Sequence, residues 1–110
     1  ANAVNFAGWD GINVQFGNAF VDVSGNTVLD TIGASGIAFI NHGGDGRITS
    51  NTVRRSGRLG VYVGNASGLE ITSNTVSDSG QLFGTTGIRW AGIHAEWANN
   101  TLIENNTVSV

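Results

Sequence analysis

The chain contains no cysteine, proline, methionine or lysine among its 110 residues, and it has only five basic and eight acidic side chains. Without cysteine it can form neither disulfide bonds nor thiolate metal sites. The lack of a basic cluster, with a net charge of −3, disfavours electrostatic binding to nucleic acid or to a membrane surface. No apolar run approaches the length of a membrane-spanning helix, and no basic segment followed by an apolar one suggests a signal peptide.

The sequence also lacks any stretch with the apolar period of an α-helix. Apolar residues alternate with polar ones in short β-branched runs, and Gly, Asn, Asp and Ser bound these runs. This pattern predicts short strands joined by tight turns, with almost no helix. We treat residues 1–110 as a single domain, because the chain is too short to form two.

One repeated string organises the predicted strands. Ile-Thr-Ser-Asn-Thr-Val occurs at residues 48–53 and again at 71–76, and looser copies lie at 23–28 and 103–108. The copies and the start of the chain place five asparagines in register: Asn2, Asn26, Asn51, Asn74 and Asn106. Their intervals of 24, 25, 23 and 32 residues are typical of a solenoid, in which each unit buries its apolar face against the next.

A second string, of Gly, a β-branched residue, any residue and an apolar residue, has the same period. It begins at Gly11, Gly36, Gly60 and Gly92. The last copy follows its asparagine by eighteen residues rather than nine or ten, which predicts an insertion of about eight residues in that coil. Each coil then contains three strands: this string, an apolar-x-apolar string, and the Thr-Val after the asparagine. Equivalent strands of successive coils are expected side by side at ~4.8 Å in parallel sheets.

These repeats resemble the right-handed parallel β-helix of the pectin-lyase-like superfamily, and the resemblance covers essentially the whole chain. It implies an all-β, right-handed, three-sheet parallel β-helix of about four coils. It also implies an inward ladder of asparagines at the turn after the second strand of each coil. Asparagine suits this turn because it tolerates the left-handed backbone conformation, and because its amide can donate to one neighbour and accept from the other.

Alternation along the strands assigns the outward side chains. The alignment gives two outward columns of alternating charge: Asp22, Arg47 and Glu70 in one, and Asp30, Arg55 and Asp78 in the other. Opposite charges on adjacent strands stabilise a sheet by about 0.2–1 kcal/mol per pair and disfavour slipped register. We therefore interpret these charges as structural.

The ends of the predicted stack have no recognisable caps. Solenoids usually cover their ends with atypical units, because open strand edges pair with other chains. We expect the chain to be either a segment of a larger solenoid or a unit whose copies stack end to end.

The outer face of the first sheet is the candidate site, because the resemblance implies a carbohydrate contact along this face and its bordering loops. Tyr62 and His94 fall on adjacent coils of one outward column, and the inserted segment carries Arg89 towards the same edge. The residues that we take as candidates for substrate binding are Asn13, Gln15, Trp90, Glu96 and Trp97.

Tyr62, His94 and Arg89 are the catalytic candidates, for polysaccharide lyase or epimerase chemistry. Such enzymes remove the proton beside a uronate carboxylate. An arginine can hold that carboxylate, a histidine titrates near neutral pH, and a tyrosine can transfer a proton. The alternative is an exposed Tyr–His pair that only packs across two strands. The chain lacks the Asp-Pro-His string and the clustered aspartates of related enzymes, so both readings stay open.

The sequence predicts no cofactor and no metal site. His42 and Asp45 lie in a Gly-rich turn, but one histidine and one carboxylate fall short of a metal shell. The predicted function is binding or processing of polysaccharide, at an extracellular or cell-surface location that the resemblance implies. The competing prediction is a non-catalytic structural solenoid of a fibre, adhesin or self-stacking filament. Polysaccharide or copies of the chain itself are the predicted partners.

Overall fold

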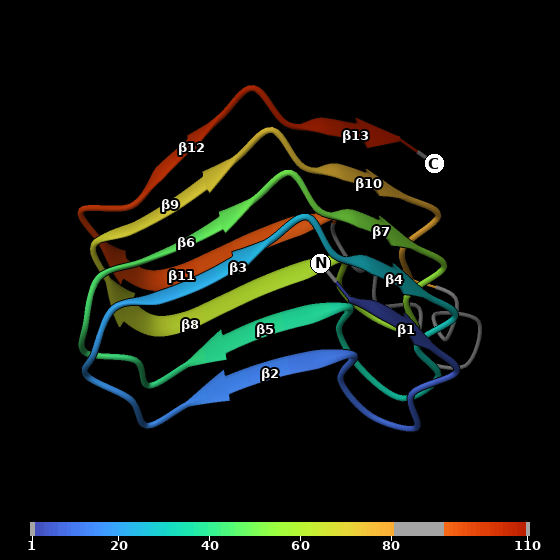
Figure 1. The fold of residues 1–110 in the computed structure, drawn as a ribbon, viewed down its shortest axis with the longest axis horizontal. Coiled ribbons are helices and arrows are strands. Elements are labelled where there is room, and N and C mark those ends of the chain that lie inside the picture. Colours follow the sequence, from blue (N-terminus) through green and yellow to red (C-terminus); the bar gives the residue numbers. More distant parts are fainter. Residues whose placement is uncertain (1, 81–91, 110) are drawn as a thin grey trace.

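The computed structural model describes residues 2–80 and 92–109, which form three parallel sheets around one core (Figure 1). Every regular element in this part of the chain is a β-strand. None of these described residues belongs to a helix long and apolar enough to cross a membrane. The architecture confirms the predicted all-β, right-handed, three-sheet parallel β-helix of about four coils.

Each sheet collects one strand from every coil. Sheet I contains β2 (Ile12–Gln15), β5 (Ile37–Ile40), β8 (Val61–Ser67) and β11 (Ile93–Asn99). Sheet II contains β3 (Val21–Ser24), β6 (Gly46–Thr49), β9 (Leu69–Thr72) and β12 (Leu102–Glu104). Sheet III contains β1 (Ala3–Asn5), β4 (Thr27–Leu29), β7 (Thr52–Arg54), β10 (Thr75–Ser77) and β13 (Thr107–Ser109). Because the coils follow one another, each strand pairs with its equivalent one coil away.

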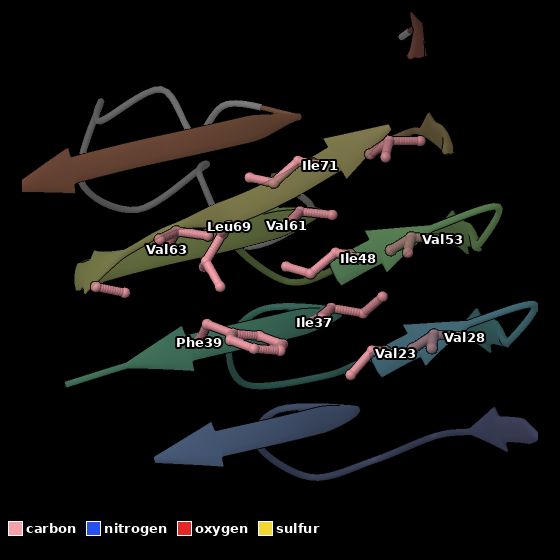
Figure 2. Packing of buried hydrophobic residues seen from close by; sticks show 12 residues of the cluster. Val23, Val28, Ile37, Phe39, Ile48, Val53, Val61, Val63, Leu69 and Ile71 are labelled. Carbon is pink, nitrogen blue, oxygen red and sulfur yellow. The ribbon is translucent and has the colours of Figure 1, made fainter. Parts of the chain in front are cut away.

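The core is a stack of aliphatic layers with one aromatic side chain, Phe39, among them (Figure 2). Alternation places these side chains inward, and those of the middle coils are fully buried. Ile103 and Val108 occupy the same inward columns in the last coil but are 46% and 51% exposed, since no further described coil covers them. The hydrophobic effect therefore acts mainly between coils, as expected for a solenoid.

The five asparagines predicted in register stack as a ladder. The Nδ2 of Asn51 donates to Oδ1 of Asn74 at 3.0 Å and to the main-chain oxygen of Val23 at 2.8 Å. Its Oδ1 accepts hydrogen bonds from the main-chain N–H and the Nδ2 of Asn26, at 2.9 and 3.0 Å. Both donors and both acceptor positions of this buried amide are satisfied, so its burial costs little.

The left-handed residue of the ladder turn is not the asparagine, contrary to the sequence prediction. Positive φ values of 56–65° occur one position earlier, at Gly25, Ser50, Ser73 and Asn105. The reason is that the ladder also uses the main-chain N–H of each asparagine, as in the 2.9 Å bond from Asn51 to Oδ1 of Asn74. The preceding residue makes the bend, which aims both the N–H and the side chain of the asparagine along the stack.

The glycines of the second repeated string allow sheet I to approach sheet III. A Cβ added at Gly36 would lie 2.2 Å from Cγ1 of Val53, and one at Gly60 would lie 2.2 Å from Cγ1 of Val76. Such distances are far below van der Waals contact. The valines that follow the ladder asparagines thus leave room only for glycine at the start of the second repeated string. This explains why the two strings repeat with the same period.

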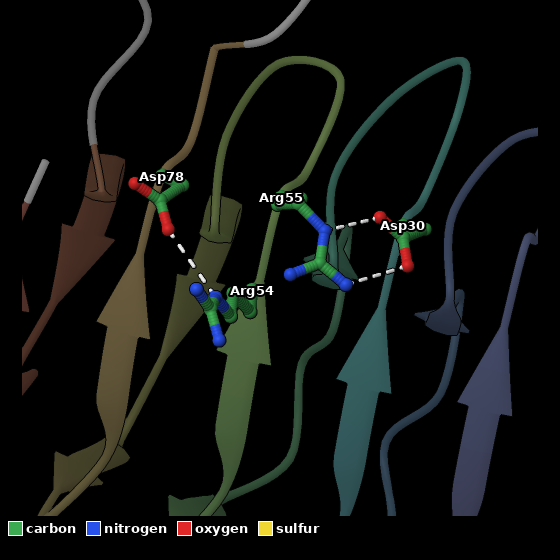
Figure 3. A network of polar contacts seen from close by, with 4 residues as sticks. All are labelled: Asp30, Arg54, Arg55 and Asp78. Carbon is green, nitrogen blue, oxygen red and sulfur yellow. Dashed lines mark hydrogen bonds and ion pairs between the residues drawn. The ribbon is translucent and has the colours of Figure 1, made fainter.

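One predicted charge column forms ion pairs, but with a changed partner (Figure 3). Arg55 binds Asp30 through two bonds, with Nη2 donating to Oδ2 at 2.7 Å, and the pair lowers the pKa of Asp30. Asp78 pairs with Arg54 instead, at 3.3 Å. Arg54 lies on the strand directly beside Ser77, so it reaches the neighbouring carboxylate as readily as Arg55 does.

The other predicted column aligns but forms no ion pair among its three described residues. Asp22, Arg47 and Glu70 are in register as expected. The guanidinium of Arg47 lies 5.4 Å from the centroid of the Phe20 ring instead. The prediction of electrostatic pairing here is wrong, because an exposed charge gains little from a neighbouring carboxylate and an aromatic face competes for it.

Replacing a central ladder residue is expected to destabilise the protein more than replacing a terminal one. Asn51→Ala leaves buried groups of Asn26, Asn74 and Val23 without partners, so we expect a loss of about 3 kcal/mol in the free energy of unfolding. The matched control is Asn2→Ala, at the exposed end of the ladder, with an expected loss of about 1 kcal/mol or less. Urea denaturation measures both values, and equal losses would contradict the ladder's role.

Candidate functional site

Three predicted site residues meet on the outer face of sheet I. Tyr62 on β8 and His94 on β11 are direct register partners, with ring centroids 5.9 Å apart and planes tilted by 32°. Glu96 follows His94 by two residues, so it projects from the same face of β11. The Tyr62 hydroxyl donates to Oε1 of Glu96 at 2.6 Å, and Nε2 of His94 lies 3.7 Å from Oε2. We call Tyr62, His94 and Glu96 the sheet I cluster.

The glycine at position 64 shapes this cluster. Gly64 pairs with Glu96 in register, and a Cβ added to Gly64 would lie 2.4 Å from the Tyr62 hydroxyl oxygen. The absence of a side chain therefore lets the Tyr62 ring lie along its own strand. That orientation brings its hydroxyl to the carboxylate on the neighbouring coil.

The hydrogen bond between Tyr62 and Glu96 shifts the pKa values of the two groups in opposite directions. The bond to Glu96, reinforced by partial burial, raises the pKa of Tyr62 to about 12. The same bond, together with the nearby His94, lowers the pKa of Glu96. At neutral pH Tyr62 is therefore a hydrogen-bond donor and Glu96 is a carboxylate with unused acceptor positions.

The other predicted site residues lie apart from the cluster or outside the described residues. Asn13 and Gln15 are on β2, and β5 separates them from Tyr62. The side chain of Asn13 already donates to Asp10. Arg89 and Trp90, with most of the predicted insertion, fall within residues 81–91 and lie outside the described part of the chain.

Trp97 lies at an unpaired, left-handed position within β11, and its side chain is 80% exposed. A pocket of about 280 Å³ adjoins it, lined also by Asn41, Asn65 and Asn99. Sequence reasoning selected Trp97 but missed the three asparagines. The register contained the signal, since Asn41, Asn65 and Trp97 directly follow the aligned residues Ile40, Gly64 and Glu96 of three successive coils.

Within the described residues, no three His, Cys, Asp or Glu side chains group in a way that could hold a metal ion. His42 is buried, and its ring packs edge-on against Phe39 with centroids 5.4 Å apart. Asp45 lies instead beneath Gly68, where an added Cβ would meet its carboxylate oxygen at 2.0 Å. The two side chains that share the Gly-rich turn thus have separate packing roles.

Comparison with known proteins supports the fold rather than a particular activity. The family model described as the right-handed beta helix region matches residues 10–110. This span contains the strands β2 to β13, and therefore both the sheet I cluster and the pocket beside Trp97. Searches of curated proteins and of solved structures found no match.

The titration of Tyr62 provides a direct measurement of the sheet I cluster. Tyr62 is the single tyrosine of the chain, so phenolate absorbance reports on it alone. We expect a midpoint at about pH 12, and a midpoint closer to the ordinary 10.0 in Glu96→Gln, because the carboxylate no longer opposes ionisation. Since the folded pKa of Tyr62 is raised and that of Glu96 is lowered, the stability from this bond is complete between the ordinary values of 4.5 and 10.0. It is lost as the pH rises through about 12 or falls through the lowered pKa of Glu96. Glu104→Gln is the control, and a wild-type midpoint near 10 would contradict the bond.

Proposed function

The chain belongs to the right-handed β-helix family, and from this premise we propose that it binds polysaccharide on the outer face of sheet I. The sheet I cluster is the observation that carries the proposal. Its carboxylate is held in place by the Tyr62 hydroxyl at 2.6 Å and retains free lone pairs that can accept bonds from sugar hydroxyls. The proposal includes an extracellular or cell-surface location, where such polymers are found.

The shape of the face supports an extended ligand. Parallel strands present their outward side chains at a constant ~4.8 Å spacing, so a linear polymer can contact several coils with the same orientation. The rings of Tyr62 and His94 lie side by side and offer apolar area for the C–H faces of sugar rings. Rigid strands hold these groups, so binding orders few side chains and loses little entropy.

Processing of the polymer is a narrower form of the proposal, in which His94 acts as base and Tyr62 as proton donor on a uronate held by Arg89. The raised pKa of Tyr62 makes its hydroxyl a weak proton donor and opposes a role as base at neutral pH. The charge of Glu96 disfavours a uronate carboxylate next to it. These two features favour binding of a neutral polymer without turnover.

Affinity electrophoresis in gels that contain single polysaccharides tests the proposal. We expect neutral polymers to retard the wild-type protein, and Glu96→Gln to weaken retention about tenfold, because a charged acceptor is lost. Glu70→Gln on sheet II is the matched control and is expected to behave as wild type. A protein that migrates freely in every polymer, or equal retention of both variants, would overturn the proposal.

The same protein incubated with alginate and pectate tests the narrower form. Lyase activity predicts new ultraviolet absorbance from unsaturated uronates, lost in His94→Ala. No increase in absorbance with either polymer would exclude lyase activity on them, and it would not affect the binding proposal.

A second candidate function is structural, and the ends of the stack favour it. A hollow of about 390 Å³ opens at the β1 end and is lined by Val4, Ile12 and Val23, while Ile103 and Val108 are half exposed at the other end. Both ends expose apolar columns that are buried in the middle coils, so another coil would cover them. We propose that this coil belongs either to a larger solenoid or to a second copy of the chain.

Sedimentation velocity at rising protein concentration tests the stacking of copies. We expect association, and we expect Val108→Lys to abolish it, because a lysine directed into the interface between two stacked copies is costly to bury. Thr107→Lys places the same charge on the outer face of β13 and is the matched control. A wild-type monomer at every concentration would exclude stacking of copies.

A further inference from the structure

A second outward column lies along sheet I, at the position directly after Gln15, Ile40, Gly64 and Glu96. This position follows β2 and β5, whereas in β8 and β11 it is an unpaired position inside the strand. It consists of Phe16, Asn41, Asn65 and Trp97, all with φ between 49° and 54°. The Nδ2 of Asn65 donates to Oδ1 of Asn41 at 2.7 Å, which leaves one N–H of Asn65 and the amide group of Asn41 with capacity for a ligand. We call this set the turn column.

Phe16 and Trp97 are the two aromatic members of the turn column. Asparagine is enriched in the left-handed region because its side chain stabilises that conformation locally, whereas a bulky aromatic residue pays a steric cost there. The turn alone therefore explains Asn41 and Asn65 but neither Phe16 nor Trp97. The two aromatic side chains are 77% and 80% exposed, so neither gains from core packing. Of the two, Trp97 lines the pocket, and this position allows its indole to contact a ligand.

The pocket beside the turn column combines three kinds of surface. Trp97 supplies an aromatic face, and Asn41, Asn65 and Asn99 supply amides that can both donate and accept. The buried His42, 1% exposed, closes the pocket on its inner side. Among the described residues that line the pocket there is no acid, lysine or arginine. A ligand that fits has an apolar face and several hydroxyl groups, and it has no charge.

We propose that this pocket binds one neutral sugar ring of the polysaccharide. The C–H face of the ring lies on the Trp97 indole, and its hydroxyls exchange hydrogen bonds with the asparagine amides. A volume of about 280 Å³ is at the small end of ligand pockets and suits a single ring rather than an oligosaccharide. This inference rests on the proposed function, because Trp97 follows Glu96 directly and the ring in the pocket continues a polymer on sheet I.

The test titrates the wild-type protein with neutral hexose oligosaccharides, with the free hexose and with trigalacturonate, and follows the indole N–H resonances. We expect the Trp97 resonance to shift with the neutral oligosaccharide, and less with the free hexose, which lacks contacts to sheet I. Trp97→Ala is expected to weaken binding about tenfold. Asn99→Ala removes a pocket amide without touching the Asn41–Asn65 bond, and we expect weaker binding there too.

Trp9→Ala is the matched control, because Trp9 is also exposed but lies outside the pocket, next to Arg58. If the wild type binds no glycan, the proposed function fails and this inference fails with it. If Trp97→Ala and Asn99→Ala bind the glycan as tightly as the wild type does, while Glu96→Gln binds it more weakly, this inference alone is overturned. Tighter binding of trigalacturonate than of neutral oligosaccharides would overturn the neutral sugar as ligand.

Discussion

A buried asparagine amide has two donors and two acceptor positions to satisfy, and in this fold only the coils above and below can satisfy them. The Oδ1 of Asn74 accepts both the main-chain N–H and the Nδ2 of Asn51, so a coil shifted by one residue would lose both bonds. Slippage would also turn the apolar columns outward. Two requirements thus fix the register between coils: the hydrogen bonds of the asparagines and the burial of the apolar side chains.

Fixed register is what assembles the candidate site. Tyr62 and His94 are 32 residues apart in sequence, with the longest interval of the repeat between them, yet they are direct partners. Neither ring contributes to the core, and neither is needed by the ladder. The interior therefore determines where outward side chains meet, but it does not determine their chemistry.

The fold could be predicted almost completely from the sequence, because every coil repeats the same inward residues. The periodic Asn, Gly and Val positions predicted the strands, the ladder and the sheet order. The conformation of the ladder turn could not be predicted, since it depends on where a main-chain N–H points rather than on residue preference. Likewise, alignment alone could not decide whether Arg54 or Arg55 reaches Asp78, because both guanidinium groups are long enough.

The sequence could predict which residues of the site share a face, but not which of them form hydrogen bonds. Spacing placed Tyr62, His94 and Glu96 on one face, whereas the bond from Tyr62 to Glu96 also requires the bare strand at Gly64. This bond bears on function because it changes how readily both groups exchange protons. A carboxylate that holds a phenol proton and a phenol whose pKa is about 12 are poorly suited to exchange protons with a substrate at neutral pH. Both can still form hydrogen bonds with hydroxyl groups, which agrees with the proposal of binding rather than processing.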